Sequence, residues 1–259
     1  HDEGNADAPV PISDTSSVLV TQLSQPGSNN VSGPPRTKEP QYGILFDVKA
    51  EHGVAPLGLM TNQAWHDDPK RLTFTFARYK FVAKMLAGRS NVLEIGCADA
   101  FATRIVQQAV GKVTAVDFDP LFIDDVKERM NPRWAFETFV HDILSGPVPG
   151  SFDAVYALDV LEHIDPAREN DFMRNVIASM LDTGVAIFGM PSLESQVHAS
   201  EQSKAGHVNC KTGADFKRML EQHFHAVFVF SMNDEVVHTG FYPMANYLIG
   251  VACHCKHAD

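Results

Sequence analysis

Apolar and polar positions follow two alternating patterns from about residue 68 onward. Short, mainly apolar runs such as "NVLEI" at 91–95 are typical of strands buried on both faces. The longer segments between these runs carry apolar residues at helical spacing, and 68–88 predicts a leading helix because Asp68 is a suitable N-cap and Pro69 suits a first turn. The predicted strands are 91–95, 113–117, 137–140, 153–158 and 185–189, and the helices among them are 101–110, 120–130 and 166–181.

The C-terminal third departs from this alternation. A helix at 213–223, begun by Thr212, is followed by strands at 225–231 and 246–254 with a loop at 232–243 between them. Two successive strands without an intervening helix predict an antiparallel pair that closes one edge of the sheet. The fold class is therefore α/β, with a doubly wound, mostly parallel sheet and an antiparallel C-terminal strand pair.

The N-terminal segment has a different composition. Residues 1–40 are rich in Ser, Pro, Gly, Asn and Asp, and such a segment buries too little apolar surface to offset its ordering entropy. We expect residues 1–40 to form a disordered or extended arm, with a partner-docking segment or a lid as the alternative. The folded domain is expected over 41–259, of which 41–90 would form an N-terminal cap and the leading helix.

Charge and cysteine content narrow the classes of partner. The chain has 32 acidic and 21 basic residues and a formal net charge of −11, which disfavours nucleic acid because phosphate binding needs clustered Lys and Arg. No apolar run reaches the roughly 18 residues of a membrane span, and the N-terminus does not read as a secretory signal. Four cysteines form no disulfide framework in a chain this long, so we expect a cytoplasmic protein.

The predicted strand ends carry small and acidic residues. Gly96, Ala98 and Ala100 follow the first strand and allow a ligand to approach the main chain, whereas Phe101 stands where a dinucleotide fingerprint requires a small residue. Asp117 ends the second strand and suits the hydroxyls of a ribose.

Asp142 follows the next strand and can meet an amine donor, while Glu94 lies in the first strand. Each acid alone could equally be a solvated strand end or a helix cap. Together, with no Lys or Arg in the first turn, they favour a phosphate-free nucleoside that carries a positive centre.

Four motifs resemble those of the class I S-adenosylmethionine-dependent methyltransferases. They are "VLEIGCADA", "AVDFDP", "VHDIL" and "FDAVYALDVLEHI", and the resemblance runs from about Asp68 to the C-terminus. It departs from the family at Ala98 and Ala100, which replace the second and third glycines of the first motif. If either position requires a positive φ, alanine costs about 1 kcal/mol relative to glycine.

The resemblance implies a Rossmann-like, seven-stranded sheet whose order reverses at the cofactor site, with S-adenosylmethionine as cofactor and S-adenosylhomocysteine as product. It implies contacts to the methionine part from the first motif, to the ribose from Asp117, to the adenine from Asp142 and Ile143, and to the sulfonium neighbourhood from Leu158. Arg78 or Tyr79 of the leading helix would hold the cofactor carboxylate. The cofactor-binding residues expected in this way are Tyr79, Glu94, Gly96, Cys97, Ala98, Asp117, Phe118, Asp142, Ile143 and Leu158.

The residues expected near the methyl acceptor have three alternative roles. Asp159, Glu162 and His163 can share one face of a helical turn, and His207 precedes a later helix, so His163 or His207 could act as a general base beside Asp159. A similarity to the ubiquinone-pathway O-methyltransferases and the small-RNA 2′-O-methyltransferases implies a divalent metal on Asp159, Glu162, His163 and His207. The third alternative is a purely structural role.

The sequence thus predicts methyl transfer to a small polar acceptor, such as a hydroxyl of a sugar, glycan or other small molecule. An RNA 2′-O-methyltransferase, a non-catalytic cofactor-binding partner protein and a nicotinamide oxidoreductase remain as alternatives. A homo-oligomer is compatible with the sequence.

Overall fold

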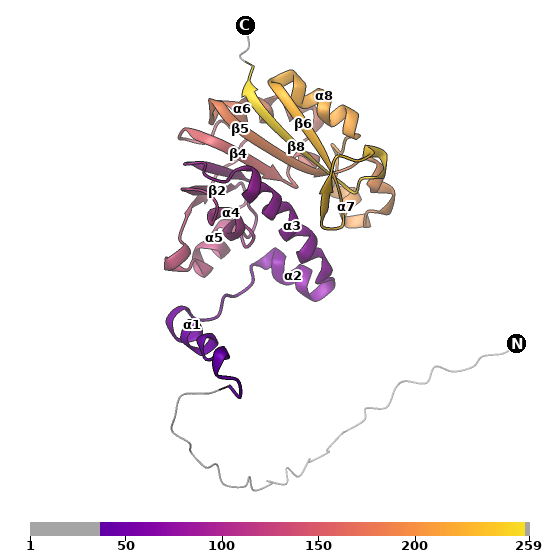
Figure 1. Cartoon of the computed structure of the whole chain (residues 1–259). Helices are drawn as coiled ribbons and strands as arrows, with labels where there is room; N and C mark the ends of the chain where they lie inside the picture. The colour runs from indigo at the N-terminus through magenta and orange to yellow at the C-terminus, as the bar shows by residue number, and fades with distance from the viewer. Residues whose placement is uncertain (1–36, 257–259) are drawn as a thin grey trace, which may run out of the picture. The chain divides into compact units, whose positions relative to one another are not determined.

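The computed structural model describes residues 37–256 (Figure 1). The predicted arm at 1–40 therefore lies, apart from its last four residues, outside the described residues. Over the described residues, the chain separates into two units, 37–51 and 52–256. In the first unit, a 3-10 turn (Pro40–Tyr42) precedes helix α1 (Ile44–His52), which buries none of its residues. No helix of the described residues is both long and apolar enough to cross a membrane.

The second unit is built on one mixed sheet of eight strands, counted over the described residues, in the order β3-β2-β1-β4-β5-β8-β6-β7. The first five of these pair in parallel, and β8 is antiparallel to both β5 and β6, which confirms the predicted fold class. The strands are β1 (Val92–Ile95), β2 (Val113–Asp117), β3 (Glu137–Val140), β4 (Phe152–Leu158), β5 (Met180–Pro191), β6 (Phe224–Asn233), β7 (Val236–His238) and β8 (Tyr247–Cys255).

Strand β7 corrects the prediction of seven strands and of a loop over 232–243. It pairs antiparallel with β6 across a tight hairpin, with Asn233 opposite Val236. Asp234 in the turn has a φ of 46°, a left-handed conformation that Asp tolerates better than most residues. The hairpin was missed because its strand is only three residues long and lacks a clear alternating pattern.

Helices cover both faces of the sheet (Figure 1). Two of them differ from prediction: the segment 101–110 is helical only in its middle, and 166–181 divides into a 3-10 turn (Pro166–Arg168), a helix and the start of β5. Helices α2 and α7 were not predicted because each is short and largely exposed. The helices are α2 (Leu59–Asp67), α3 (Lys70–Met85), α4 (Thr103–Gln107), α5 (Pro120–Arg129), α6 (Glu169–Ala178), α7 (Glu201–Gly206) and α8 (Gly213–His223).

The central strands are buried on both faces, as their apolar runs predicted. Leu93 of β1 packs into the core layer that contains Phe172 and Phe216 of α6 and α8, whereas its neighbour Val92 packs with Val82 of α3. Strand β1 pairs with both β2 and β4, so the strand order reverses there. In such a sheet the crevice at the carboxyl ends of these strands is the expected ligand site.

Candidate functional site

A cavity of about 1190 Å³ lies at the carboxyl ends of β1 to β4 and is lined as well by α2, α3 and residues 191–207. This volume exceeds the usual range for one small ligand, so it can hold a cofactor and a second molecule. The predicted cofactor residues that line it are Tyr79, Gly96, Cys97, Ala98, Asp117, Phe118, Asp142, Ile143 and Leu158. Glu94 does not line the cavity.

The turn after β1 has a left-handed backbone at three positions. The φ values are 72° at Gly96, 46° at Ala98 and 49° at Ala100. Both alanines therefore occupy positions where glycine is favoured. A Cβ atom on Gly96 would collide with a methyl group of Val160. The turn therefore brings main-chain atoms close to the cavity while the alanines retain local strain.

Asp117 and Asp142 are held by backbone amides at the ends of β2 and β3. The two carboxylate oxygens of Asp117 accept from the N–H groups of Ala98 and Asp119, each at 2.9 Å. One oxygen of Asp142 accepts from Leu144 N–H at 2.9 Å. Each carboxylate oxygen has a second lone pair, so both side chains can still accept from a ligand in the cavity.

Glu94 lies beneath the cavity and is fully buried. Its carboxylate accepts hydrogen bonds from Tyr79 Oη and Tyr156 Oη at 2.8 Å each and from Thr103 Oγ1 at 2.5 Å. Burial raises the pKa of Glu94 from 4.5 to about 7, although the three hydroxyl donors oppose that rise. Glu94 thus ties α3 and α4 to the sheet, and the Tyr79 hydroxyl is committed to this contact.

Arg78 and Asp159 form an ion pair at the cavity wall. Nη1 of Arg78 donates to the two oxygens of Asp159 at 2.9 and 2.6 Å, and the guanidinium lies 4.4 Å from the ring centre of Phe74 and 3.7 Å from that of Tyr247. Burial is the largest influence and lowers the pKa of Arg78, but the charge and hydrogen bond of Asp159, together with Tyr247 and Glu162, outweigh it, so the pKa is raised. Asp159, which has a φ of 57°, is thereby turned toward α3.

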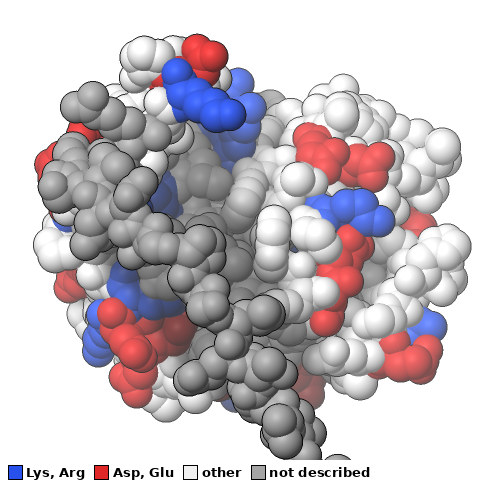
Figure 2. Space-filling view, turned by 90° about the horizontal axis from the view of Figure 1, so that it is seen from below, with Lys and Arg blue, Asp and Glu red and all other residues white. Residues whose placement is uncertain are grey.

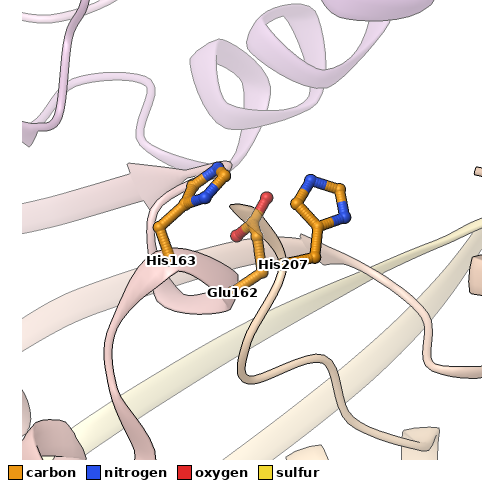
Figure 3. A group of neighbouring side chains, drawn as sticks. All are labelled: Glu162, His163 and His207. Atoms are coloured by element: carbon orange, nitrogen blue, oxygen red, sulfur yellow. The ribbon is translucent and has the colours of Figure 1, made fainter. Parts of the chain in front are cut away.

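Glu162, His163 and His207 lie together at the end of β4 (Figure 3). One oxygen of Glu162 and one ring nitrogen of each histidine all lie within 4.8 Å of one another. The Glu162 carboxylate points into the space between the two imidazoles (Figure 3). The backbone carbonyl of Glu162 accepts from the N–H groups of Val208 and Asn209 at 2.8 and 3.0 Å, which joins these distant segments.

The hydrogen bonds of this cluster leave specific atoms available. His163 Nδ1 lies 2.9 Å from the carbonyl oxygen of Gly206 and His207 Nδ1 lies 2.8 Å from Gln196 Oε1, so each Nδ1 donates and each Nε2 keeps its lone pair. Glu162 Oε2 is buried and has no hydrogen-bond partner. Burial, and then the nearby Asp159, raise the pKa of Glu162 well above its ordinary value.

The four-residue set predicted for a metal is therefore brought together only in part. Within the described chain, the group whose donor atoms converge contains Glu162, His163 and His207. Asp159 is instead bound by Arg78. The pKa of His207 is lowered, first by burial and then by the nearby His163.

Sequence reasoning assigned no role to several residues that line the cavity, among them Arg71, Thr75 and Ser203. Arg71, Thr75 and Arg78 recur at helical spacing along α3, so one face of this helix forms a wall of the cavity. That spacing is visible in the sequence. The position of α3 above the strand ends is not, and it decides which face meets the ligand.

Comparison with known proteins is consistent with this geometry. Residues 92–184 match a family model described as a methyltransferase domain. A probable S-adenosylmethionine-dependent methyltransferase of Mycobacterium tuberculosis, Rv3030, is 29% identical over 124 residues, which cover 46% of this chain and 43% of that protein. The mitochondrial ubiquinone biosynthesis O-methyltransferase of Schizosaccharomyces pombe is 28% identical over 101 residues, or 36% of this chain and 35% of that protein. The chain therefore spans less than half the length of either relative.

Solved structures share the fold. The N-methyltransferase NodS of Bradyrhizobium japonicum WM9, crystallised with S-adenosyl-L-homocysteine, matches with a TM-score of 0.52 and 19% identity over 73% of this chain and 89% of that chain. The methyltransferase domain of bacterial CtHen1-C matches with a TM-score of 0.55 and 17% identity over 70% and 98%. With the match of residues 92–184 to a methyltransferase domain and the strand order of the sheet, these likenesses show that the chain has the Rossmann-like methyltransferase fold.

Proposed function

We propose that this protein binds S-adenosylmethionine in the cavity at the strand ends and transfers its methyl group to a hydroxyl of a small polar acceptor. The acidic rim supports the cofactor assignment. Asp117 and Asp142 offer free lone pairs where a ribose and an adenine would lie, and five carboxylates among the lining residues favour a sulfonium cation. The cavity also has room for an acceptor beside the cofactor.

The observation that carries the choice of a hydroxyl acceptor is the imidazole pair at the end of β4. A hydroxyl loses its proton as it is methylated, and a positioned base assists that step. The unprotonated Nε2 atoms of His163 and His207 suit this role, because hydrogen bonds to Gly206 and Gln196 hold each ring by its other nitrogen. Alignment of acceptor and sulfonium, and exclusion of water, would supply the rest of the rate enhancement.

The same residues fit a divalent metal ion. The partnerless Glu162 Oε2 and the two imidazoles form a mixed oxygen and nitrogen donor set, and the S. pombe relative is named an O-methyltransferase. Glu162, His163 and His207 would hold the ion, with Asp159 outside the set because of its pairing with Arg78. A bound ion would polarise the acceptor hydroxyl and favour loss of its proton.

An RNA acceptor is disfavoured by charge. Outside the grey atoms, acidic and basic side chains are interspersed on the face in Figure 2, without a continuous basic field. The net charge of −11 also disfavours binding to the phosphates of RNA. A small hydroxylated molecule, such as a sugar or a glycan unit, is therefore the preferred class.

Methyl transfer to a panel of sugars, glycans, phenols, amines and short RNAs would test the proposal, alongside calorimetric titration with S-adenosylhomocysteine. We expect binding of that product and transfer to a hydroxylated member of the panel. Absence of binding at millimolar concentration would contradict the cofactor assignment. Transfer confined to amines would contradict the hydroxyl acceptor, and transfer confined to RNA would contradict the small acceptor.

Substitution of the histidine pair would then test the chemistry. His207→Ala should lower turnover about 100-fold or more and leave the affinity for S-adenosylhomocysteine unchanged, because the base acts only on the acceptor. His225→Ala, an exposed position on β6, is the matched control. Loss of activity to a chelator, restored by Mg²⁺ or Mn²⁺, would favour the metal version, and indifference to chelator would favour the base.

A further inference from the structure

The two imidazoles at the end of β4 are held by oxygens of different kinds. His163 Nδ1 donates to a main-chain carbonyl, that of Gly206, whereas His207 Nδ1 meets the side-chain amide of Gln196 at 2.8 Å. A carbonyl oxygen can only accept, but a side-chain amide presents an acceptor or a donor according to which end faces the ring. The position of the proton on His207 therefore depends on how the Gln196 amide is turned.

The residue that follows β5 decides the orientation of this amide. Gln196 belongs to a 3-10 turn (Glu194–His198), and its nitrogen Nε2 lies 3.1 Å from the main-chain oxygen of Ser192. Because that oxygen only accepts, the NH₂ group of Gln196 faces it and the amide oxygen faces His207. The reverse orientation would bring two oxygens together without a hydrogen between them and would leave both without a donor.

Ser192 is itself fixed by the segment that leads into β8. It is fully buried, its Oγ donates to the carbonyl oxygen of Ala245 at 2.6 Å, and its N–H donates to that of Asn246 at 3.1 Å. Ser195 Oγ also donates to the main-chain oxygen of Ser192, at 2.8 Å. A chain of hydrogen bonds thus runs from the antiparallel part of the sheet to the ring of His207.

We infer that Gln196 is a positioning residue, which fixes His207 in the tautomer that carries its proton on Nδ1 and keeps a lone pair on Nε2. The proposed reaction needs that lone pair, whether it takes a proton from the acceptor or binds an ion. The amide is neutral, so it orients the ring without adding charge beside a cavity wall that already holds five carboxylates. The catalytic consequence rests on the proposed function, whereas the proton position is measured independently of it.

The first test locates the proton by ¹⁵N NMR of the histidine side chains at about pH 8, where imidazole is neutral, in the presence of a chelator. The signals absent from His207→Ala identify His207, which should be protonated on Nδ1 in the wild type. Gln196→Met keeps the length of the side chain and removes the acceptor, so the Nδ1-protonated population should fall to about half or less. Gln196→Glu keeps an acceptor oxygen and should retain the wild-type tautomer.

The second test separates turnover from binding. Gln196 does not line the cavity, so Gln196→Met should lower kcat about tenfold or more while it changes the KM of the acceptor and the affinity for S-adenosylhomocysteine by less than about twofold. Gln196→Glu should return kcat to within about threefold of the wild type, because it restores the acceptor for Nδ1. Gln202→Met makes the same change at an exposed position of α7 and is the matched control in both tests.

The outcomes distinguish the inference from the proposed function. A wild-type His207 protonated on Nε2, or a Gln196→Met variant that keeps the wild-type tautomer, would overturn the inference. An unchanged kcat in a variant whose tautomer has shifted would overturn its catalytic part. If the wild type transfers no methyl group to any acceptor, the proposed function fails, and the NMR measurement alone decides whether Gln196 positions the ring.

Discussion

Glu94 offers the sharpest test of the energetics beneath the cavity. Glu94→Gln removes the ionisable group and keeps its size, and the amide can still meet Tyr79, Tyr156 and Thr103 because hydroxyl groups both donate and accept. The substitution therefore isolates the free energy of ionising a buried carboxyl group. It leaves the packing between α3, α4 and the sheet in place.

The sign and size of the effect follow from the raised pKa. The folded protein binds the Glu94 proton more tightly than the unfolded chain does, since burial moves the pKa from 4.5 to about 7. The stabilising contribution is therefore complete below about pH 4.5 and is lost as the pH rises through 7. At about 1.4 kcal/mol per pH unit, the total loss approaches about 3.5 kcal/mol, of which about 2.5 kcal/mol falls between pH 5 and pH 8.

The assay is urea unfolding at a series of pH values from 5 to 8. The free energy of unfolding of the wild type should fall relative to that of Glu94→Gln by about 2.5 kcal/mol over this range. Glu128→Gln removes an exposed carboxylate from α5 and provides the reference for surface charge. Parallel pH profiles for the wild type and Glu94→Gln would refute the reasoning, because they would mean that Glu94 ionises as easily in the folded protein as in the unfolded chain.

Two further predictions concern the turn after β1. Gly96→Ala should destabilise the protein by about 2 kcal/mol or more and weaken binding of S-adenosylhomocysteine. The new Cβ would collide with Val160, and residue 96 has a φ of 72°, which disfavours alanine. Thermal melting measures the first effect and calorimetry the second, and wild-type values in both would contradict this geometry. Ala98→Gly should raise the free energy of unfolding by about 0.5 to 1 kcal/mol, since relief of left-handed strain at a φ of 46° exceeds the added entropy of the unfolded chain. A loss of about 1 kcal/mol in urea unfolding, as is usual for Ala→Gly in a helix, would show that Ala98 is not strained.

The sheet was largely predictable because local patterns carried the signal. Buried parallel strands require continuous apolar runs, and the alternation of such runs with helical segments leaves few arrangements of the chain. The order reversal at β1 placed Gly96, Asp117 and Asp142 at one edge, as expected. Elements with weak local signals were missed, among them α2 and the three-residue strand β7, because tertiary contacts rather than periodicity stabilise them.

The tertiary structure, rather than the local sequence, determines which side chains pair with one another. Spacing placed Asp159, Glu162 and His163 on one turn, but the ion pair with Arg78 draws Asp159 away and leaves Glu162 with the two histidines. Residues of α3 that are about 80 positions from Asp159 in the chain decide this outcome, and no local pattern records which partner a charged group will find. Residue types and their order along the chain thus specify the sheet and the place of the site, whereas long-range packing selects which groups remain free to act, because charge pairing and burial depend on neighbours that only the folded chain brings together.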